Sequence, residues 1–198
     1  MRIFRIISSL MMSAVIVTSC VIRTSRGETL NSTSSFDALE VFSGIEVILT
    51  PSPTVSFAVE GNERAKSKLE MRVDNGTLRI EADGLRSGDW LKIRLSAPVP
   101  EKMTAYSGSR IINEGTLNIE RLDIRGWNNA SIALNGHVAI VELDIASWNS
   151  ATVEIGNISA ANVTVRAFNE SRTELGGSAE HISVSCLNNA TVDTTGLN

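Results

Sequence analysis

The sequence is poor in the residues that most often build catalytic and metal centres. It has two cysteines, Cys20 and Cys186, and two histidines, His137 and His181, in 198 residues. The histidines fall at different points of the repeat described below, and no group of His, Cys and carboxylate residues has zinc spacing. No glycine-rich phosphate loop follows a strand and opens a helix. We therefore expect no metal and no cofactor.

Charge is also sparse and mixed along the chain. The formal net charge is −4, and no run of like charge stands out. A mildly acidic protein is repelled by phosphate backbones, and it offers no basic patch to anionic lipids. We expect no nucleic-acid partner.

A long hydrophobic run is missing as well. The apolar stretch at 6–17 is too short for a comfortable membrane span, and with the two arginines before it, it is typical of an export signal over residues 1–19. The signal ends in Val17-Thr18-Ser19-Cys20, which resembles the bacterial lipobox. By that resemblance the chain is cut before Cys20, and the Cys20 sulfur carries diacylglycerol, so that the membrane is a partner through the lipid anchor. The alternative is an ordinary secretory signal with a chance cysteine.

Residues 20–35 comprise this cysteine and a polar stretch that is typical of a flexible tether. Val21 rather than Asp follows Cys20, which in lipoproteins resembles the pattern for outer-membrane sorting. We therefore expect an exported protein of the cell envelope, an outer-membrane lipoprotein. Without the signal, 16 basic residues face 22 acidic ones, so the mature chain has a formal charge of −6.

Residues 36–100 are rich in strand patterns but show no obvious repeat. Apolar side chains alternate in several short runs, which predicts strands with one buried face. Asn75-Gly76 between two such runs predicts a tight hairpin, because both residues tolerate positive φ. A short helix is expected over residues 62–69, with Asn62 as its N-cap. Pro98 and Pro100 stop the pairing before the repeats begin.

A five-residue motif, here called the phrase, recurs through the rest of the chain. Its aromatic or leucine position advances by 21, 21, 20 and 19 residues. A period near 20 residues in strand-like sequence is typical of coils stacked on one another. The copies are Ala105-Tyr106-Ser107-Gly108-Ser109, Gly126-Trp127-Asn128-Asn129-Ala130, Ser147-Trp148-Asn149-Ser150-Ala151, Ala167-Phe168-Asn169-Glu170-Ser171 and Cys186-Leu187-Asn188-Asn189-Ala190.

Alternating apolar runs flank each copy and give two definite strands and one short strand per coil. A short strand cannot bury a face alone, but it can when it is stacked on its copy, about 4.8 Å away. Crossovers between parallel strands are right-handed by default. We therefore predict an all-β fold, a right-handed parallel β-helix (solenoid) at 101–198 with an amino-terminal β-rich cap region at 36–100, in one continuous domain. The rival, an antiparallel sandwich, also alternates but does not explain the fixed period.

Four asparagines each end one strand and begin a corner. Asparagine tolerates the left-handed backbone that a corner needs, and stacked amides can bond to one another along a ladder. The position that begins each phrase takes only small residues, so we expect Cys186 to be a buried filler rather than a reactive thiol. The predicted structural ladder is Asn128, Asn149, Asn169 and Asn188.

An aromatic column is the one surface for which we predict a function. Strand alternation places Trp127 outward, and the period places its equivalents above and below it. Stacked outward rings can hold sugar faces or the apolar surface of a partner. The alternatives are that the rings cover the corner, pack under the amino-terminal strands or turn inward. The candidate binding column is Tyr106, Trp127, Trp148 and Phe168, with Leu187 at its end.

A weak acidic stripe is the only hint of catalysis. Glycoside hydrolysis needs two close carboxylates. Glu154, Glu174 and Asp193 occupy matching strand positions, so they should be neighbours that raise one another's proton affinity. The alternative is a solvated stripe, screened by Arg172 or by a loosely held cation. We expect no catalytic residue and a protein that is not an enzyme.

Several marks between residues 36 and 196 resemble the bacterial "putative auto-transporter adhesin, head GIN domain" family. The family usually has Ser-Gly-Ser-Gly-like corners, which this chain keeps only at Ser107-Gly108-Ser109. The resemblance implies an exported, often lipid-anchored β-helical protein and supplies no catalytic residue. The marks are Phe36, Val41, Gly44, Ile45, Val47 and Leu49, then Asn75-Gly76-Thr77-Leu78-Arg79-Ile80, and then the repeats.

These observations together favour a lipid-anchored cell-envelope protein that acts as a non-catalytic adhesion or binding module for a glycan or a protein. One alternative is a structural or envelope-stress accessory protein without a small ligand. The other is a carbohydrate-active enzyme that uses the acidic stripe.

Overall fold

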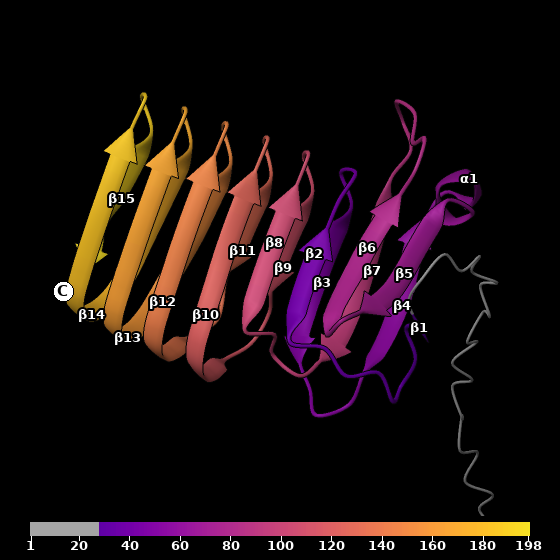
Figure 1. The fold of residues 1–198 in the computed structure, drawn as a ribbon, viewed down its shortest axis with the longest axis horizontal. Coiled ribbons are helices and arrows are strands. Elements are labelled where there is room, and N and C mark those ends of the chain that lie inside the picture. The colour runs from indigo at the N-terminus through magenta and orange to yellow at the C-terminus, as the bar shows by residue number, and fades with distance from the viewer. Residues whose placement is uncertain (1–27) are drawn as a thin grey trace, which may run out of the picture.

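The structure is a computed structural model that describes residues 28–198. It is a nearly all-β solenoid of about five turns. Figure 1 shows the strands stacked side by side, from the amino-terminal elements at one end to the yellow strand β15 at the other. The prediction of an all-β parallel β-helix is confirmed. The predicted signal at 1–19, Cys20 and the first part of the tether lie outside the described residues. The prediction of a flexible tether as far as residue 35 is wrong for its last part, because the strand Glu28–Thr29 pairs with Val73 and Arg72 and Leu30 is buried in the core.

The strands account for almost all of the regular structure, and no helix among the described residues is long and apolar enough to cross a membrane. The amino-terminal elements are β1 (Glu28–Thr29), β2 (Ala38–Val41), β3 (Glu46–Pro51), β4 (Ser56–Gly61), α1 (Glu63–Lys66), β5 (Leu69–Asp74), β6 (Thr77–Ala82) and β7 (Leu91–Ala97). The repeats form β8 (Lys102–Tyr106), β9 (Arg110–Asn113), β10 (Leu117–Trp127), β11 (Ser131–Leu134), β12 (Val138–Trp148), β13 (Thr152–Phe168), β14 (Arg172–Leu187) and β15 (Thr191–Leu197).

Successive coils pair in parallel and in register. Leu122 of β10 lies opposite Leu143 of β12, which lies opposite Val163 of β13. The short third strand predicted for each coil does not stand alone. It runs on into the following strand through a bend, where the pairing of β10 with β12 skips Glu120 and Val141.

The core is a set of columns in which like side chains lie over one another. Inward-pointing Ile, Leu and Val residues of the inner coils are almost fully buried. One polar cluster interrupts them, where the Ser147 hydroxyl donates to Ser171 Oγ at 3.0 Å and lies 3.3 Å from Thr173 Oγ1. Because these hydroxyls satisfy one another, small polar residues are tolerated inside the solenoid.

The chain does not build its coils in sequence order. Strands β2 and β3 lie between β6 and β7 on one side and β8 and β9 on the other, and all of these pairs are parallel. Antiparallel strands then close this end, with β5 on β6 and β4 on β7. Residues 36–100 therefore contribute coil strands as well as a cap.

Two local predictions fall in this part. The predicted hairpin is confirmed, since β5 and β6 are joined through Asn75 and Gly76, which have φ values of 48° and 75°. The helix is shorter than expected, because residue Leu69 already begins β5. Asn62 caps the helix as predicted, and its Oδ1 accepts the N–H of Ala65 at 2.9 Å.

Cys186 is not the buried filler that its small-residue position predicts. Its side chain is exposed, because it lies on β14 in the last coil and no later described strand covers it. The thiol donates to the carbonyl oxygen of Ala190 at 2.8 Å. The equivalent Ser147 and Ala167 are fully buried in earlier coils, so the prediction fails only where the solenoid ends.

Candidate functional site

The recurring phrase forms the same tight turn in successive coils. In Trp127-Asn128-Asn129-Ala130, the two asparagines have φ values of 55° and 62°, and the N–H of Ala130 donates to the Trp127 carbonyl at 3.3 Å. Positive φ at both central residues is the mark of a type I′ turn. Asparagine is one of the few non-glycine residues that accept this backbone, which explains why it recurs here.

The side chains of these asparagines form a ladder along the solenoid. Asn149 Nδ2 donates to Asn128 Oδ1 at 2.8 Å, and Asn169 Nδ2 donates to Asn149 Oδ1 at 2.9 Å. Asn188 Nδ2 donates to Asn169 Oδ1 at 2.9 Å. The ladder joins four coils at one corner, as the sequence analysis predicts.

Replacing Asn149 by glycine should isolate the contribution of the ladder. Glycine keeps the φ of 53° without strain but removes both amide bonds. We expect the free energy of unfolding in urea to fall by about 1–2 kcal/mol, since each of the two lost hydrogen bonds is exposed and contributes roughly 0.5–1 kcal/mol. In the control Asn129→Gly, φ is 62° and no ladder bond is lost. Equal losses in the two variants would contradict a role for the ladder.

Beside these turns, aromatic side chains form a column on the outer face. Trp127 and Trp148 stack with ring centroids 3.9 Å apart and planes 10° apart. Phe168 continues the stack, 5.9 Å from Trp148. All three side chains are half-buried, and the exposed Leu187 follows in register. The rings therefore point outward and do not fill the core.

One ring of this column escaped the sequence analysis. Phe42 stacks on Tyr106 with centroids 4.5 Å apart, and the Arg79 guanidinium lies 4.8 Å from the Phe42 centroid. Phe42-Ser43-Gly44 matches Tyr106-Ser107-Gly108, and the Ser-Gly pair has positive φ in both. A comparison of these two phrases would have found the additional ring. The aromatic column, as observed, is Phe42, Tyr106, Trp127, Trp148 and Phe168.

The stacking decides what the aromatic column can bind. The faces of Trp127 and Trp148 lie against each other, so solvent meets mainly their edges. A sugar stacks its C–H groups on the electron-rich face of a ring, and that face is occupied here. A flat protein surface can pack against ring edges without needing a free face. The geometry therefore suits a protein better than a stacked sugar.

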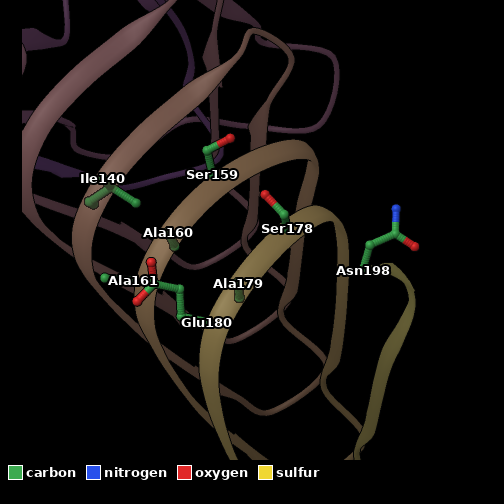
Figure 2. A pocket seen from close by; sticks show the side chains of 8 residues that line it. All are labelled: Ile140, Ser159, Ala160, Ala161, Ser178, Ala179, Glu180 and Asn198. Atoms are coloured by element: carbon green, nitrogen blue, oxygen red, sulfur yellow. The ribbon is translucent and has the colours of Figure 1, made fainter.

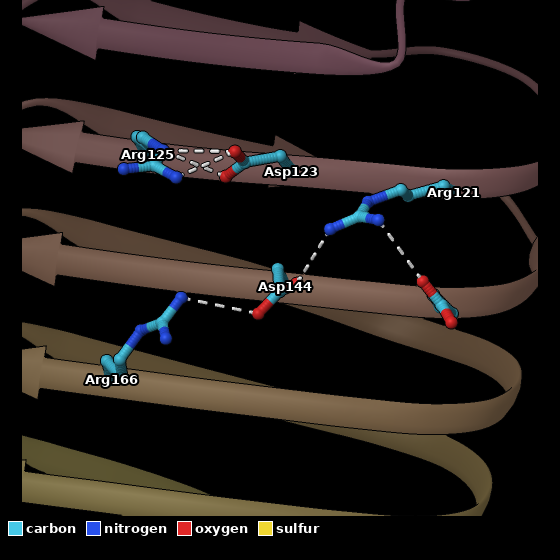
Figure 3. Close-up of polar contacts among 6 residues, drawn as sticks. Arg121, Asp123, Arg125, Asp144 and Arg166 are labelled. Atoms are coloured by element: carbon cyan, nitrogen blue, oxygen red, sulfur yellow. Dashed lines mark hydrogen bonds and ion pairs between the residues drawn. The ribbon is translucent and has the colours of Figure 1, made fainter.

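A network of ion pairs covers the same outer face, and Figure 3 shows it. Arg125 binds Asp123 on the same strand, with Nη2 2.8 Å from Oδ2, and this hydrogen bond raises the pKa of Arg125. Asp144 receives Arg121 from one neighbouring coil at 3.6 Å and Arg166 from the other at 3.3 Å. Exposed pairs contribute only about 0–1 kcal/mol each, so the network sets the charge pattern of the face more than its stability.

Tyr106 is the one polar ring in the column. Burial raises the pKa of its phenol, the charge of Glu40 raises it further, and Arg79 and Arg125 partly offset both effects. The hydroxyl therefore stays protonated at neutral pH and can donate a hydrogen bond to a partner.

The acidic stripe lies on another outer wall, away from the aromatic column. Glu154 is opposite Glu174, which is opposite Asp193, and the three line a shallow depression of about 440 Å³. Arg172 forms an ion pair with Glu174, so the arginine does screen the stripe.

The expectation that these carboxylates raise one another's proton affinity is wrong for Asp193. The backbone N–H of Thr195 donates to its carboxylate at 2.9 Å and lowers the pKa of Asp193 below its ordinary value. A carboxyl group with a lowered pKa is ionised at neutral pH and is a poor general acid. The geometry thus weakens the case for glycoside hydrolysis at this stripe.

A second shallow depression, of about 480 Å³, lies near the carboxyl-terminal end (Figure 2). Small side chains line most of it, and Glu180 supplies its one carboxylate. Within residues 28–198, no three His, Cys, Asp or Glu side chains gather so as to hold a metal ion. The lining residues are Ile140, Ser159, Ala160, Ala161, Ser178, Ala179, Glu180 and Asn198.

Comparison with known proteins places this architecture in a family. The family model described as "Putative auto-transporter adhesin, head GIN domain" matches residues 35–198. No curated protein has a sequence that matches the chain.

Three of the solved structures to which the chain is similar come from bacteria of the genus Parabacteroides. The chain is similar to a "Putative lipid binding protein" from Parabacteroides distasonis, with a TM-score of 0.74 and 16% identity over 87% of this chain and 75% of that chain. It is also similar to a "putative adhesin" from Parabacteroides merdae, with a TM-score of 0.74 and 15% identity over 84% of this chain and 71% of that chain. A "putative adhesin" from Parabacteroides distasonis has a TM-score of 0.69 and 14% identity over 87% of this chain and 76% of that chain. At such identities the likeness shows the fold.

Proposed function

The chain belongs to the "Putative auto-transporter adhesin, head GIN domain" family, and from that premise we propose that it is a non-catalytic adhesion module that binds a protein through its aromatic column. Membership of this family indicates an extracellular or cell-surface protein. The family description names adhesins and no enzyme.

The observation that carries the proposal is the aromatic column itself. Five rings, half-buried and outward-facing, are fixed at strand spacing along one wall of the solenoid. The rings are held by strands that pair in register. Binding would therefore not have to order a flexible surface, a step that costs free energy and weakens affinity. Arginines and aspartates beside the rings add a polar rim, as protein interfaces have around an apolar centre.

Lipid anchoring is part of the same proposal. A diacylglycerol on Cys20 would hold the folded part to the outer membrane through the residues between Cys20 and β1, with the aromatic column free to meet a partner. The support is the lipobox-like Val17-Thr18-Ser19-Cys20. A Cys20→Ser chain should leave the membrane fraction, and its retention there would contradict the anchor.

The binding surface is tested by comparing two triple variants. The first, Trp127→Ala with Trp148→Ala and Phe168→Ala, removes the rings of three adjacent coils. The second, Glu154→Gln with Glu174→Gln and Asp193→Asn, changes the acidic stripe and keeps the column. Binding to immobilised mucin, fibronectin, laminin and collagen is measured by surface plasmon resonance, and sugar binding on a glycan array.

We expect wild type and the acidic-stripe variant to bind at least one of these proteins equally. The ring variant should lose at least 100-fold in affinity, since removing aromatic anchors costs about 2 kcal/mol or more each. Circular dichroism must show the same β content in all three proteins. Unchanged binding by the ring variant, or binding only to glycans, would overturn the proposal. Turnover of a polysaccharide that the acidic-stripe variant loses would instead support an enzyme.

A further inference from the structure

The two ends of the solenoid are built differently. At the amino-terminal end, antiparallel β4 and β5 cover the last parallel strands, and Leu30 and Phe36 are buried with them. At the other end, β14 and β15 are the outermost strands described, and neither has a further strand on its outer side. One end is therefore closed and the other is open.

The open end exposes the columns of the core. Val165 is fully buried, whereas Val184, its equivalent on β14, is 46% exposed. Val163 is 2% exposed, and its equivalent Ile182 is 43% exposed. These side chains point along the same rows as the buried ones, so they form an apolar end surface on a rigid frame.

The edge strands at this end carry little of the usual protection against pairing, apart from one irregularity in the pairing of β15 with β14 between Glu174 and Gly176. Natural proteins guard exposed strand edges with charges, prolines or bulges, because unpaired N–H and C=O groups attract other strands. From Ile182 to Asn198 the sequence has no proline, and Asp193 is its only charged side chain. The three equivalent stretches before it, 122–142, 143–162 and 163–181, each carry at least two charged side chains, among them the ion-paired Asp123, Asp144 and Arg172.

We propose that this end binds the same end of a second copy of the chain, in a two-fold symmetric dimer. A partner at this end must pair with the edges of both β14 and β15, which belong to two walls of the solenoid, and must also cover the apolar side chains between these walls. A single peptide strand can extend only one wall, whereas another solenoid end has both walls at the same separation. A two-fold axis across the junction makes the facing strands antiparallel, and it covers Ile182 and Val184 of both copies.

The geometry also favours a closed dimer over a growing filament. Head-to-tail stacking would seat the open end on the amino-terminal end, where β1 already pairs with β5 and Leu30 and Phe36 are buried with the capping strands. An isologous contact uses one patch on each copy and closes after two. The dimer would place the aromatic columns of its two copies on one elongated body, which goes beyond the proposed adhesion function and does not depend on it.

The test uses the full exported chain with Cys20→Ser, so that no lipid drives association and Cys186 is the only thiol. Light scattering across a dilution series should give twice the chain mass. The double variant Ile182→Lys and Val184→Lys should give the mass of one chain with unchanged circular dichroism. Val141→Lys is the matched control, because Val141 is 49% exposed on β12, away from the end, and this variant should stay dimeric.

A spin label on Cys186 provides a second measurement that needs no change at the interface. In the dimer the two labels lie on facing edges and give one short interspin distance, whereas a monomer gives none. A wild-type mass of one chain, a mass above two chains, or a dimer that survives the double lysine variant would each overturn the proposal.

Discussion

Gly136→Ala is expected to lower the free energy of unfolding by about 3 kcal/mol, near the top of the usual range for overpacking. A Cβ at this position would lie 1.8 Å from the carbonyl oxygen of Gly115 and 2.4 Å from its carbonyl carbon. Both are backbone atoms, so no flexible side chain can move aside. One coil would have to shift against the next, and the hydrogen bonds between coils oppose that shift.

The measurement is urea and thermal unfolding followed by circular dichroism. In a domain of this size, a loss of about 3 kcal/mol corresponds to a fall in Tm of roughly 6–12 °C. Gly156→Ala is the control, since Gly156 lies inside β13, directly after the buried Ile155, and has nothing within 4 Å of the built Cβ. It should stay within about 0.5 kcal/mol of wild type. If both variants lose the same stability, the clash with Gly115 is not the cause.

The contrast between these glycines also marks a limit of the sequence. A glycine follows the second strand of successive coils, and the pattern alone treats Gly136 and Gly156 as equivalent. Only the coordinates distinguish a glycine packed on the backbone of the preceding coil from one that faces open space. The distance between the backbones of neighbouring coils depends on how the coils pack in three dimensions, and the sequence pattern does not contain that information.

The fold itself could be predicted because it follows from a repeat that is visible along the sequence. A period near 20 residues makes Leu122, Leu143 and Val163 equivalent, and the structure pairs them directly. The order of the coils could not be predicted, since β2 lies between β6 and β8, and β3 between β7 and β9, in a way that no period records. Phe42 was missed for the same reason, because its copy of the phrase lies outside the regular spacing.

The column was predicted at the level of position but not of geometry. Alternation gives the outward direction of Trp127 correctly, yet it does not say that the ring faces are occupied by stacking. The sequence leaves a glycan and a protein open as the partner, and that single fact favours the protein. Cys186 shows a different limit, since its small-residue position predicts burial only where another coil follows.

Ile145→Ala should have an effect as large as that of Gly136→Ala, by the opposite mechanism. Ile145 is fully buried on β12, between Ile124 of one coil and Val165 of the next. Truncation removes apolar contacts and leaves a cavity, and buried Ile→Ala changes usually cost about 2–5 kcal/mol. The cost depends on whether the surroundings can collapse. Here parallel pairing on both sides of β12 fixes the coil spacing, so we expect about 4 kcal/mol.

Val141→Ala is the control for this prediction, because it truncates an exposed rather than a buried side chain on the same strand. Val141 lies on the same strand, four residues away, but is half exposed, so its change should stay within about 0.5 kcal/mol of wild type in urea unfolding. The slope against urea should be unchanged in both variants, because coupling between neighbouring coils keeps unfolding cooperative when one contact weakens. A shallow slope or two transitions for Ile145→Ala would mean that coils on either side of β12 unfold separately. Since stability in stacked repeats depends on the contacts between neighbours, the column through Ile145 is where the solenoid should be most sensitive.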